Sequence, residues 1–290
     1  MDGPTPNYVY LNGQVLPRAQ AHLDIEDRGA MFADGVYEVI RYYGGRPFAL
    51  DRHLRRLDES LKALRIDPPA ELPGLPAATL ELLKKNGTPE ASVYWQITRG
   101  VAERTHAIPP GLRPTVLAIA YPVPAVDHAA PPPAVSTILL PDERWGHCAI
   151  KSLMLLPNVL AKSRAHEAGA DEAILHRGRK VTEGSSTNVM IVGQDGVLRT
   201  HRANERILHG VTRAIVLELA GELGVKVVER AFVTDDLFTA AEVFITGSTT
   251  QMAAVTAVDG KTVGGGKIGP VTLRLYRAFL ERVGHECGTW

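Results

Sequence analysis

A proline-rich segment near the middle of the chain, PVPAVDHAAPPPA at residues 122–134, most limits how this sequence can fold. Each of its five prolines lacks a backbone N–H and holds φ at about −65°, so the segment suits neither a helix nor an inner strand. We therefore expect a stiff, extended linker. It separates a small N-terminal α/β domain over residues 1–121 from a larger C-terminal domain over residues 135–290.

Hairpins and helices are predicted in the N-terminal half. VYLNGQVL (9–16) and VYEVIRYYGGRPFAL (36–50) predict hairpins that turn at Asn12-Gly13 and at Gly44-Gly45. Asp51 is expected to cap a helix, DRHLRRLDESLKAL, whose apolar stripe supplies a buried face. The stripe consists of Leu54, Leu57, Leu61 and Leu64, and the further elements are a helix near 76–86 that ends at Gly87 and strands within 92–100 and 114–122.

The C-terminal half combines strands with three predicted helices. The first helix, residues 157–170, has Pro157 near its first turn and Gly169 at its end. Strands and hairpins are expected over 171–192 and 195–201, and the other helices cover 210–224 and 272–283. Antiparallel strands and helices that occur in groups indicate an α+β fold with two domains rather than a doubly wound parallel sheet.

Composition and charge exclude several classes of protein. Lys+Arg and Asp+Glu both number 32, so no net field favours nucleic acid or an anionic membrane as a partner. The two cysteines, Cys148 and Cys287, lack the spacing of a metal site and argue against a disulfide framework. The first 13 residues lack the pattern of a signal peptide, and no apolar run approaches the roughly 20 residues that span a bilayer. We expect a soluble cytoplasmic protein without a metal.

Lys151 stands in an unusually apolar stretch, AIKSLMLL at residues 149–156. Burial of a charged ammonium costs several kcal/mol, so such a lysine either keeps its head group in water or becomes a neutral, nucleophilic amine. Taken alone, the stretch favours the surface lysine.

Several other segments offer an acid and anion-binding groups. Glu183 lies in KVTEGSSTN (180–188), Gly210 to Thr212 open a predicted helix, and TGSTT (246–250) is a small hydroxyl-rich loop. Arg56 could add a charge-assisted contact. Each feature also has an ordinary explanation as a turn, a helix cap or a solvated charge. Together with Lys151 they match pyridoxal phosphate, which requires an amine for a Schiff base, an acid at its ring nitrogen and donors for its phosphate.

The sequence resembles the class IV, or fold type IV, pyridoxal-phosphate aminotransferases, and within them the D-amino acid aminotransferases. The resemblance covers nearly the whole chain, in blocks that follow the order and spacing of that family. These blocks are EDRGAMFADGVYEV (26–39), RGVAERTHAIP (99–109), AIKSLMLL, LAKSRAHEAGADEAIL, VTEGSSTN and ANERILHGVTR (203–213). The resemblance implies a fold type IV enzyme whose C-terminal domain binds pyridoxal 5'-phosphate, and a homodimer.

The resemblance also implies roles for single residues. Lys151 would form the Schiff base with the cofactor and shuttle the proton during transamination. Glu183 would lie against the pyridine nitrogen and keep it protonated. The remaining residues that it assigns to the phosphate or the ring are Arg56, Leu208, Val211, Thr212 and Ser248.

Substrate binding would depend on a second set. The resemblance implies that Arg104 and His106 bind the substrate α-carboxylate together with Tyr37, and that their loop reaches toward the partner's active site. A guanidinium and an imidazole can hold a carboxylate through directed hydrogen bonds. The side on which the carboxylate is held decides which enantiomer reacts.

Three residues depart from the family pattern. Met154 stands where relatives often carry a polar residue, Ala33 replaces a glycine, and Gly247 occupies a usual hydroxyl position. They bear on side-chain preference and cofactor affinity.

The expected reaction is ping-pong transfer of the amino group from D-alanine to 2-oxoglutarate, which gives pyruvate and D-glutamate. Alternatives with the same fold are a branched-chain L-amino acid aminotransferase, an (R)-amine transaminase and a 4-amino-4-deoxychorismate lyase. The Arg104-X-His106 pair argues against all three. Alternatives of other classes are a cofactor-free Schiff-base aldolase, which would use Lys151 alone, and a non-catalytic ligand-binding protein.

Overall fold

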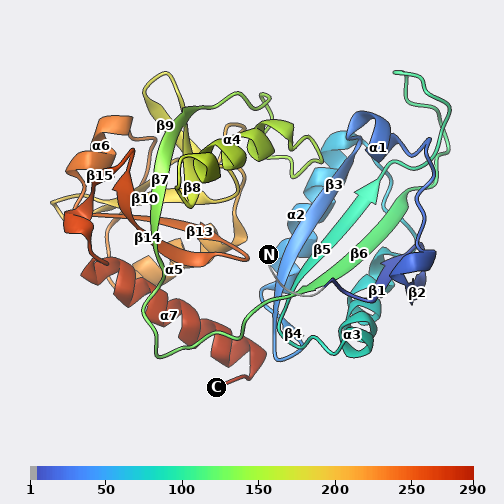
Figure 1. The fold of residues 1–290 in the computed structure, drawn as a ribbon, viewed down its shortest axis with the longest axis horizontal. Coiled ribbons are helices and arrows are strands. Elements are labelled where there is room, and N and C mark those ends of the chain that lie inside the picture. The colour runs from blue at the N-terminus through green and yellow to red at the C-terminus, as the bar shows by residue number, and fades with distance from the viewer. Residues whose placement is uncertain (1–4) are drawn as a thin grey trace. The chain divides into compact units, whose positions relative to one another are not determined.

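The computed structural model describes residues 5–290, and these form two compact units (Figure 1). Unit 1 comprises the described residues up to Val126, together with Ile150–Met154 and Val283–Trp290. Unit 2 comprises Asp127–Ala149 and Leu155–Arg282. The expectation that no signal peptide is present rests partly on residues 1–4, which lie outside the described residues.

Unit 1 is built on a six-stranded antiparallel sheet in the order β2-β1-β6-β5-β3-β4. Both predicted hairpins are confirmed, since Asn12, Gly13, Gly44 and Gly45 all have the positive φ that tight hairpin turns require. The strands are β1 (Tyr8–Leu11), β2 (Gln14–Pro17), β3 (Gly35–Tyr43), β4 (Arg46–Pro47), β5 (Ala91–Thr98) and β6 (Thr115–Pro122).

The helices of unit 1 are α1 (Arg28–Phe32), α2 (Leu50–Leu64) and α3 (Leu75–Asn86), with short 3-10 turns at Arg18–Gln20 and Leu72–Gly74. The prediction that Asp51 caps α2 is wrong, because the helix begins one residue earlier and its N-cap is Ala49. Asp51 instead lies in the first turn, where its carboxylate interacts favourably with the helix dipole. The helix predicted near 76–86 is confirmed and ends at Gly87.

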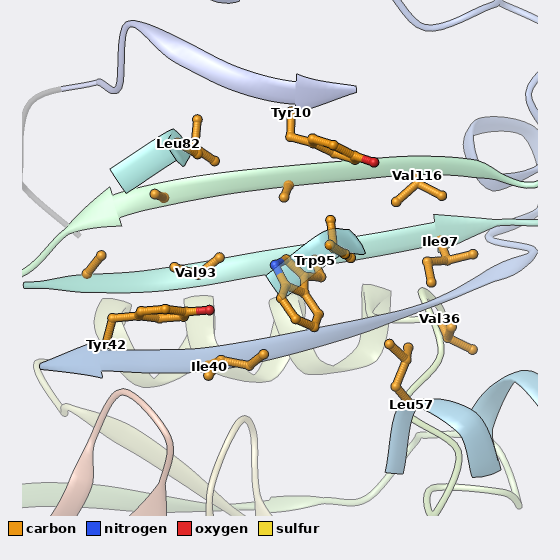
Figure 2. Close-up of a cluster of buried hydrophobic side chains, with 14 of the residues drawn as sticks. Tyr10, Val36, Ile40, Tyr42, Leu57, Leu82, Val93, Trp95, Ile97 and Val116 are labelled. Carbon is orange, nitrogen blue, oxygen red and sulfur yellow. The ribbon is translucent and has the colours of Figure 1, made fainter. Parts of the chain in front are cut away.

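The core of unit 1 packs α2 and α3 against the sheet (Figure 2). Leu57 and Leu61 of the predicted stripe are fully buried, and Leu54 and Leu64 pack against the same cluster. Trp95 of β5 is also fully buried, and its indole N–H donates to Thr79 Oγ1 at 3.0 Å. A large aromatic side chain therefore enters the core without an unsatisfied donor.

Unit 2 contains a nine-stranded mixed sheet. Its main path is β12-β11-β10-β13-β14-β7-β8-β9, and β15 pairs with β14. β7 runs parallel to both β8 and β14, and β11 runs parallel to β12. The strands are β7 (Ala134–Pro141), β8 (Glu172–Arg177), β9 (Lys180–Gly184), β10 (Asn188–Val192), β11 (Leu198–Thr200), β12 (Val227–Glu229), β13 (Glu242–Gly247), β14 (Gln251–Val258) and β15 (Lys261–Thr262).

The remaining helices are α4 (Leu156–Glu167), α5 (Val211–Glu222), α6 (Thr234–Thr239) and α7 (Pro270–Cys287), with a 3-10 turn at Gly264–Gly266. The three helices predicted in the C-terminal half are thus confirmed as α4, α5 and α7, whereas the sequence analysis did not anticipate α1 or α6. The α+β prediction is also confirmed. Within residues 5–290, we find no helix that combines the length and the apolar character needed to cross a bilayer.

Candidate active site

The residues assigned to the site from the sequence fall into two groups, one in each unit. Unit 1 carries Tyr37, Arg56, Arg104, His106 and Lys151, and unit 2 carries Glu183, Leu208, Val211, Thr212 and Ser248.

Lys151 is held against the start of β3 by backbone contacts. The Tyr37 N–H donates to the Lys151 carbonyl oxygen at 3.0 Å, and the Lys151 N–H donates to Ser60 Oγ of α2 at 3.2 Å. The half-buried side chain places Nζ 4.1 Å from the centroid of the Tyr37 ring. Two residues far apart in the sequence are therefore brought together, and the amine is fixed next to an aromatic face.

Arg56 belongs to a buried cluster that joins β3 to α2. Its Nε and Nη2 donate to the two carboxylate oxygens of Glu38 at 2.7 and 2.8 Å, and His53 Nδ1 lies 2.7 Å from Glu38 Oε2. All three side chains are buried. The sequence analysis missed Glu38 and His53, although Glu38 lies at an inward-facing position of β3 between Val36 and Ile40 and thus carries a detectable signal.

Electrostatics fix the charges in this cluster. Burial opposes ionisation of Glu38, but the charge of Arg56 and hydrogen bonds from Arg56 and His53 hold the pKa of Glu38 at about 2. Burial lowers the pKa of His53, against the influence of Glu38. An ionised Glu38 beside a neutral His53 implies that the imidazole donates its Nδ1–H to the carboxylate.

Arg104 and His106 lie on the exposed loop between β5 and β6. Both side chains contact Phe32, the last residue of α1: the Arg104 guanidinium carbon lies 5.5 Å from its ring centroid, and the His106 ring lies edge-on at 5.7 Å. Within the described part of the chain, no hydrogen bond or ring contact joins either residue to Tyr37.

Glu183 is the centre of the group in unit 2. Its buried carboxylate accepts hydrogen bonds from the Leu208 N–H at 3.0 Å and from Asn188 Nδ2 at 2.9 Å, and it forms an ion pair with Arg144. Burial raises the pKa of Glu183, while the charge of Arg144 counteracts this rise. The alternative of an exposed carboxylate in a turn is therefore wrong, and Leu208 contacts Glu183 through its backbone.

Arg144 and Asp142, which the sequence analysis also missed, support this acid. Arg144 Nη2 donates to Asp142 Oδ2 at 2.9 Å, and Arg177 and Thr182 donate to the same oxygen. Burial alone would lower the pKa of Arg144, but Asp142 and Glu183 raise it above its usual range. Glu183 consequently faces a permanent cation.

The first turn of α5 begins shortly after Leu208, whose N–H donates to Glu183, and could hold an anion. The helix begins at Val211 and Thr212 after the N-cap Gly210, and no side chain among the described residues caps it, so its first N–H groups are available to a ligand. Gly210 is required here, because a Cβ at that position would lie 2.0 Å from Asn188 Oδ1. Asn188 therefore links the acid to the helix start.

The loop that carries Ser248 lies at the same end of the sheet. Asn188 of β10 pairs with Thr246 of β13, and the turn at Ser248 follows directly. Thr246 Oγ1 is buried and has no hydrogen-bond partner among the described residues. An unsatisfied hydroxyl, a half-buried serine and an uncapped helix start fit a phosphate ester, so the residues of unit 2 suit pyridoxal phosphate.

The hydroxyl cluster after Glu183 has a different partner. Ser185, Ser186 and Thr187 all donate to the carboxylate of Glu172, a buried residue of β8. The three hydroxyls thus hold the loop after β9 in place. Glu172 could have been found from the sequence only if it had been known that β8 and β9 pair and bring the loop after β9 to the start of β8.

Comparisons with known proteins agree with this chemistry. The family model "Amino-transferase class IV" matches residues 35–258. The D-alanine aminotransferase of Bacillus licheniformis is 43% identical over 95% of this chain and 96% of its own length, and that of Staphylococcus haemolyticus is 38% identical over 95% and 97%.

Solved structures with a similar fold include branched-chain aminotransferases. The Escherichia coli enzyme is 28% identical, has a TM-score of 0.87 and covers 97% of this chain and 96% of its own. The Thermoproteus uzoniensis enzyme is 26% identical, has a TM-score of 0.85 and covers 98% and 97%. A further branched-chain enzyme, solved with pyridoxamine 5'-phosphate, is 28% identical with a TM-score of 0.87 and covers 97% and 95%. The family match, the near-complete coverage and this bound cofactor establish that the chain belongs to the class IV aminotransferases, which are pyridoxal-phosphate-dependent enzymes.

Proposed function

We propose that this protein is a D-amino acid aminotransferase that transfers the amino group of D-alanine to 2-oxoglutarate and yields pyruvate and D-glutamate. The observation that carries the proposal is the pair Arg104 and His106, which one loop presents together on the ring of Phe32. The relatives named D-alanine aminotransferases, at 38–43% identity, support the same substrates.

Lys151 is the proposed acid–base and nucleophilic group. When bound, pyridoxal phosphate supplies an electron sink that makes the substrate Cα–H acidic. Lys151 Nζ is held beside the Tyr37 ring. It would take the proton from the substrate Cα and give it up again later in the same half-reaction. In the second half of the cycle the same amine would deliver a proton to the Cα that derives from 2-oxoglutarate.

Glu183 is proposed to hold a proton at the pyridine nitrogen. Its carboxylate is fixed by Asn188 and the Leu208 N–H, and Arg144 favours its ionised form. An ionised acid in a buried site can keep an opposing pyridine nitrogen protonated, because separating that pair would leave an uncompensated charge.

Phosphate binding is proposed for Val211, Thr212, Ser248 and Arg56. The uncapped start of α5 supports the first two roles. Arg56 Nε and Nη2 donate hydrogen bonds to Glu38, and these two bonds fix the orientation of the planar guanidinium.

A homodimer is part of the proposal. Within residues 5–290, Arg104 and His106 form no hydrogen bond or ring contact with Tyr37 of their own subunit, which supports a role for their loop at the partner's active site. Exposed apolar side chains close to this loop in the sequence, Val101 at 42% and Ile108 at 44%, would be covered in a dimer. The cytoplasmic location and the absence of membrane and nucleic-acid partners stay predictions from the sequence.

A branched-chain L-amino acid aminotransferase is the second candidate, because solved structures with a similar fold include branched-chain aminotransferases. Initial rates with D-alanine and with L-leucine, each with 2-oxoglutarate, separate the two candidates.

The proposed function is tested by Arg104→Ala. We expect a loss of about 100-fold or more in kcat/KM for D-alanine, because a charge-assisted contact to the carboxylate disappears, while the yellow colour of the bound cofactor is retained. The matched control is Arg113→Ala on the same loop region, whose guanidinium pairs with Glu71 on the surface. An Arg104→Ala variant as active as the wild type would remove the carboxylate assignment.

A further inference from the structure

The ring of Phe32 is shared by three cationic or aromatic neighbours. Arg104 Cζ lies 5.5 Å from its centroid, the His106 ring lies at 5.7 Å with an interplanar angle of 68°, and Arg28 Cζ lies at 4.8 Å. These are the separations of cation–π and edge-to-face contacts. The two side chains that are proposed to bind the substrate carboxylate therefore rest on one aromatic surface.

Arg28 fixes the backbone of the same loop. Its side chain is buried, and Nη1 donates to the carbonyl oxygen of Thr105 at 2.8 Å, between Arg104 and His106. Its own N–H donates to the Gly100 carbonyl oxygen at 2.9 Å. One residue of α1 thus contacts both the base of the loop and its functional centre.

An ion-pair chain locks Arg28 in this orientation. Arg28 Nε and Arg99 Nε both donate to Asp34 Oδ2 at 2.8 Å, and Arg99 also donates to the carbonyl oxygens at the end of α2, Leu64 and Arg65. Burial disfavours the charge of Asp34, but Arg99 and Arg28 lower its pKa below the usual range. The anchor is therefore ionised, and it connects the loop to a rigid helix.

We infer that Phe32 and Arg28 are positioning residues that hold Arg104 and His106 in the orientation needed to bind the substrate α-carboxylate. This inference rests on the proposed function. An exposed arginine samples many rotamers, and a binding site that must first order it binds more weakly. The Phe32 ring and the buried Arg28 guanidinium order the loop in advance and so reduce that penalty. Their loss should therefore weaken carboxylate binding more than it slows proton transfer at Lys151.

The test compares Phe32→Leu with Phe32→Tyr and with a matched control. Leucine keeps an apolar side chain but removes the ring, whereas tyrosine keeps the ring. Phe48→Leu is the control, because Phe48 is a buried aromatic residue of unit 1 whose ring lies edge-on to that of Tyr43. The measurements are kcat and KM for D-alanine, hydrogen exchange of residues 101–107 in the cofactor-free protein, and thermal unfolding.

We expect Phe32→Leu to raise KM for D-alanine about tenfold, with kcat within about threefold of the wild type, and to speed hydrogen exchange in the loop. Phe32→Tyr should have the KM and the loop hydrogen exchange of the wild type. Arg28→Lys should resemble Phe32→Leu, because one ammonium cannot replace the several contacts of the Arg28 guanidinium. Phe48→Leu should lower the unfolding temperature and leave KM and loop exchange unchanged.

Two results would overturn the inference: unchanged KM and loop exchange in Phe32→Leu, or an equal rise of KM in Phe48→Leu. Failure of the proposed function is a separate outcome. If Arg104→Ala retains full activity with D-alanine, the carboxylate assignment itself is wrong, whereas an inactive Arg104→Ala with a silent Phe32→Leu removes only the positioning role.

Discussion

Ala33, which replaces a glycine of the family pattern, has a strained backbone conformation. It ends α1 with φ of +54°, in the left-handed region, and its N–H closes the helix on the Arg28 and Gly29 carbonyl oxygens. A side chain in this conformation costs about 1 kcal/mol relative to glycine. This cost explains the glycine that we expect at this position in related proteins.

Ala33→Gly should raise the free energy of unfolding by up to about 1 kcal/mol, reduced by the greater freedom of glycine in the unfolded chain. Ala30→Gly inside α1 is the matched control and should lower it by up to about 1 kcal/mol. Urea unfolding measures both. A destabilised Ala33→Gly protein would show that the left-handed conformation is not strained.

Arg144→Gln tests the support of Glu183. Without the cation, burial should raise the pKa of Glu183 further, so that the neutral form of the acid becomes more favoured. We expect a loss of roughly 10- to 100-fold in kcat and a shift of the acidic limb of the pH–rate profile to higher pH. Arg177→Gln is the control, because Arg177 donates a hydrogen bond to Asp142. This variant should not shift the acidic limb of the pH–rate profile. Identical profiles for both variants would contradict this role.

Single-residue chemistry was only partly visible in the sequence. The apolar surroundings of Lys151 and the acid at Glu183 could be recognised, and Glu38 carries a signal as an acid at an inward-facing position of β3, but Glu172 and Arg144 could not be recognised. Their importance depends on contacts between strands and loops far apart in the chain, such as Glu183 with Arg144. No local pattern encodes such pairs.

At the scale of elements, the sequence was sufficient to predict turns and helices that depend on neighbouring residues. The Asn12-Gly13 turn and the leucine stripe of α2 each follow from neighbouring residues, and both are confirmed. Helix α1 was missed, because five residues are too few to show a helical period. The contact of Lys151 with β3 is also a long-range pairing that periodicity cannot reveal.

The Glu38 cluster ties β3 to α2 and makes the pair sensitive to acid. The pKa of Glu38 is depressed to about 2 from 4.5, so its contribution is present above about pH 4.5 and is lost as pH falls toward 2. The shift corresponds to at most about 3 kcal/mol of folding free energy.

Glu38→Gln should lower the free energy of unfolding at pH 7 by roughly 3 kcal/mol, because Arg56 would be left buried without its counter-charge. By the same linkage, the variant should lose about 2 kcal/mol less stability than the wild type between about pH 5 and about pH 3. Urea titrations across this range measure the difference. Parallel losses in both proteins would show that Glu38 does not titrate in this way.

At the scale of the whole molecule, the proposed homodimer makes each active site depend on two subunits. A mixture of Lys151→Ala and Arg104→Ala subunits should then recover about a quarter of the wild-type activity, since about half of the dimers are mixed and each contains one complete site. Each variant alone is expected to be nearly inactive. A mixture that stays inactive after subunit exchange would place the loop at the active site of its own subunit.

The configuration of the product glutamate tests the central claim most directly. The wild-type enzyme is incubated with D-alanine and 2-oxoglutarate, and the glutamate is resolved on a chiral column, with Lys151→Ala as the inactive control. We expect D-glutamate alone, formed in equal amount to pyruvate. Formation of L-glutamate, or a clear preference for L-leucine over D-alanine as the amino donor, would contradict the account.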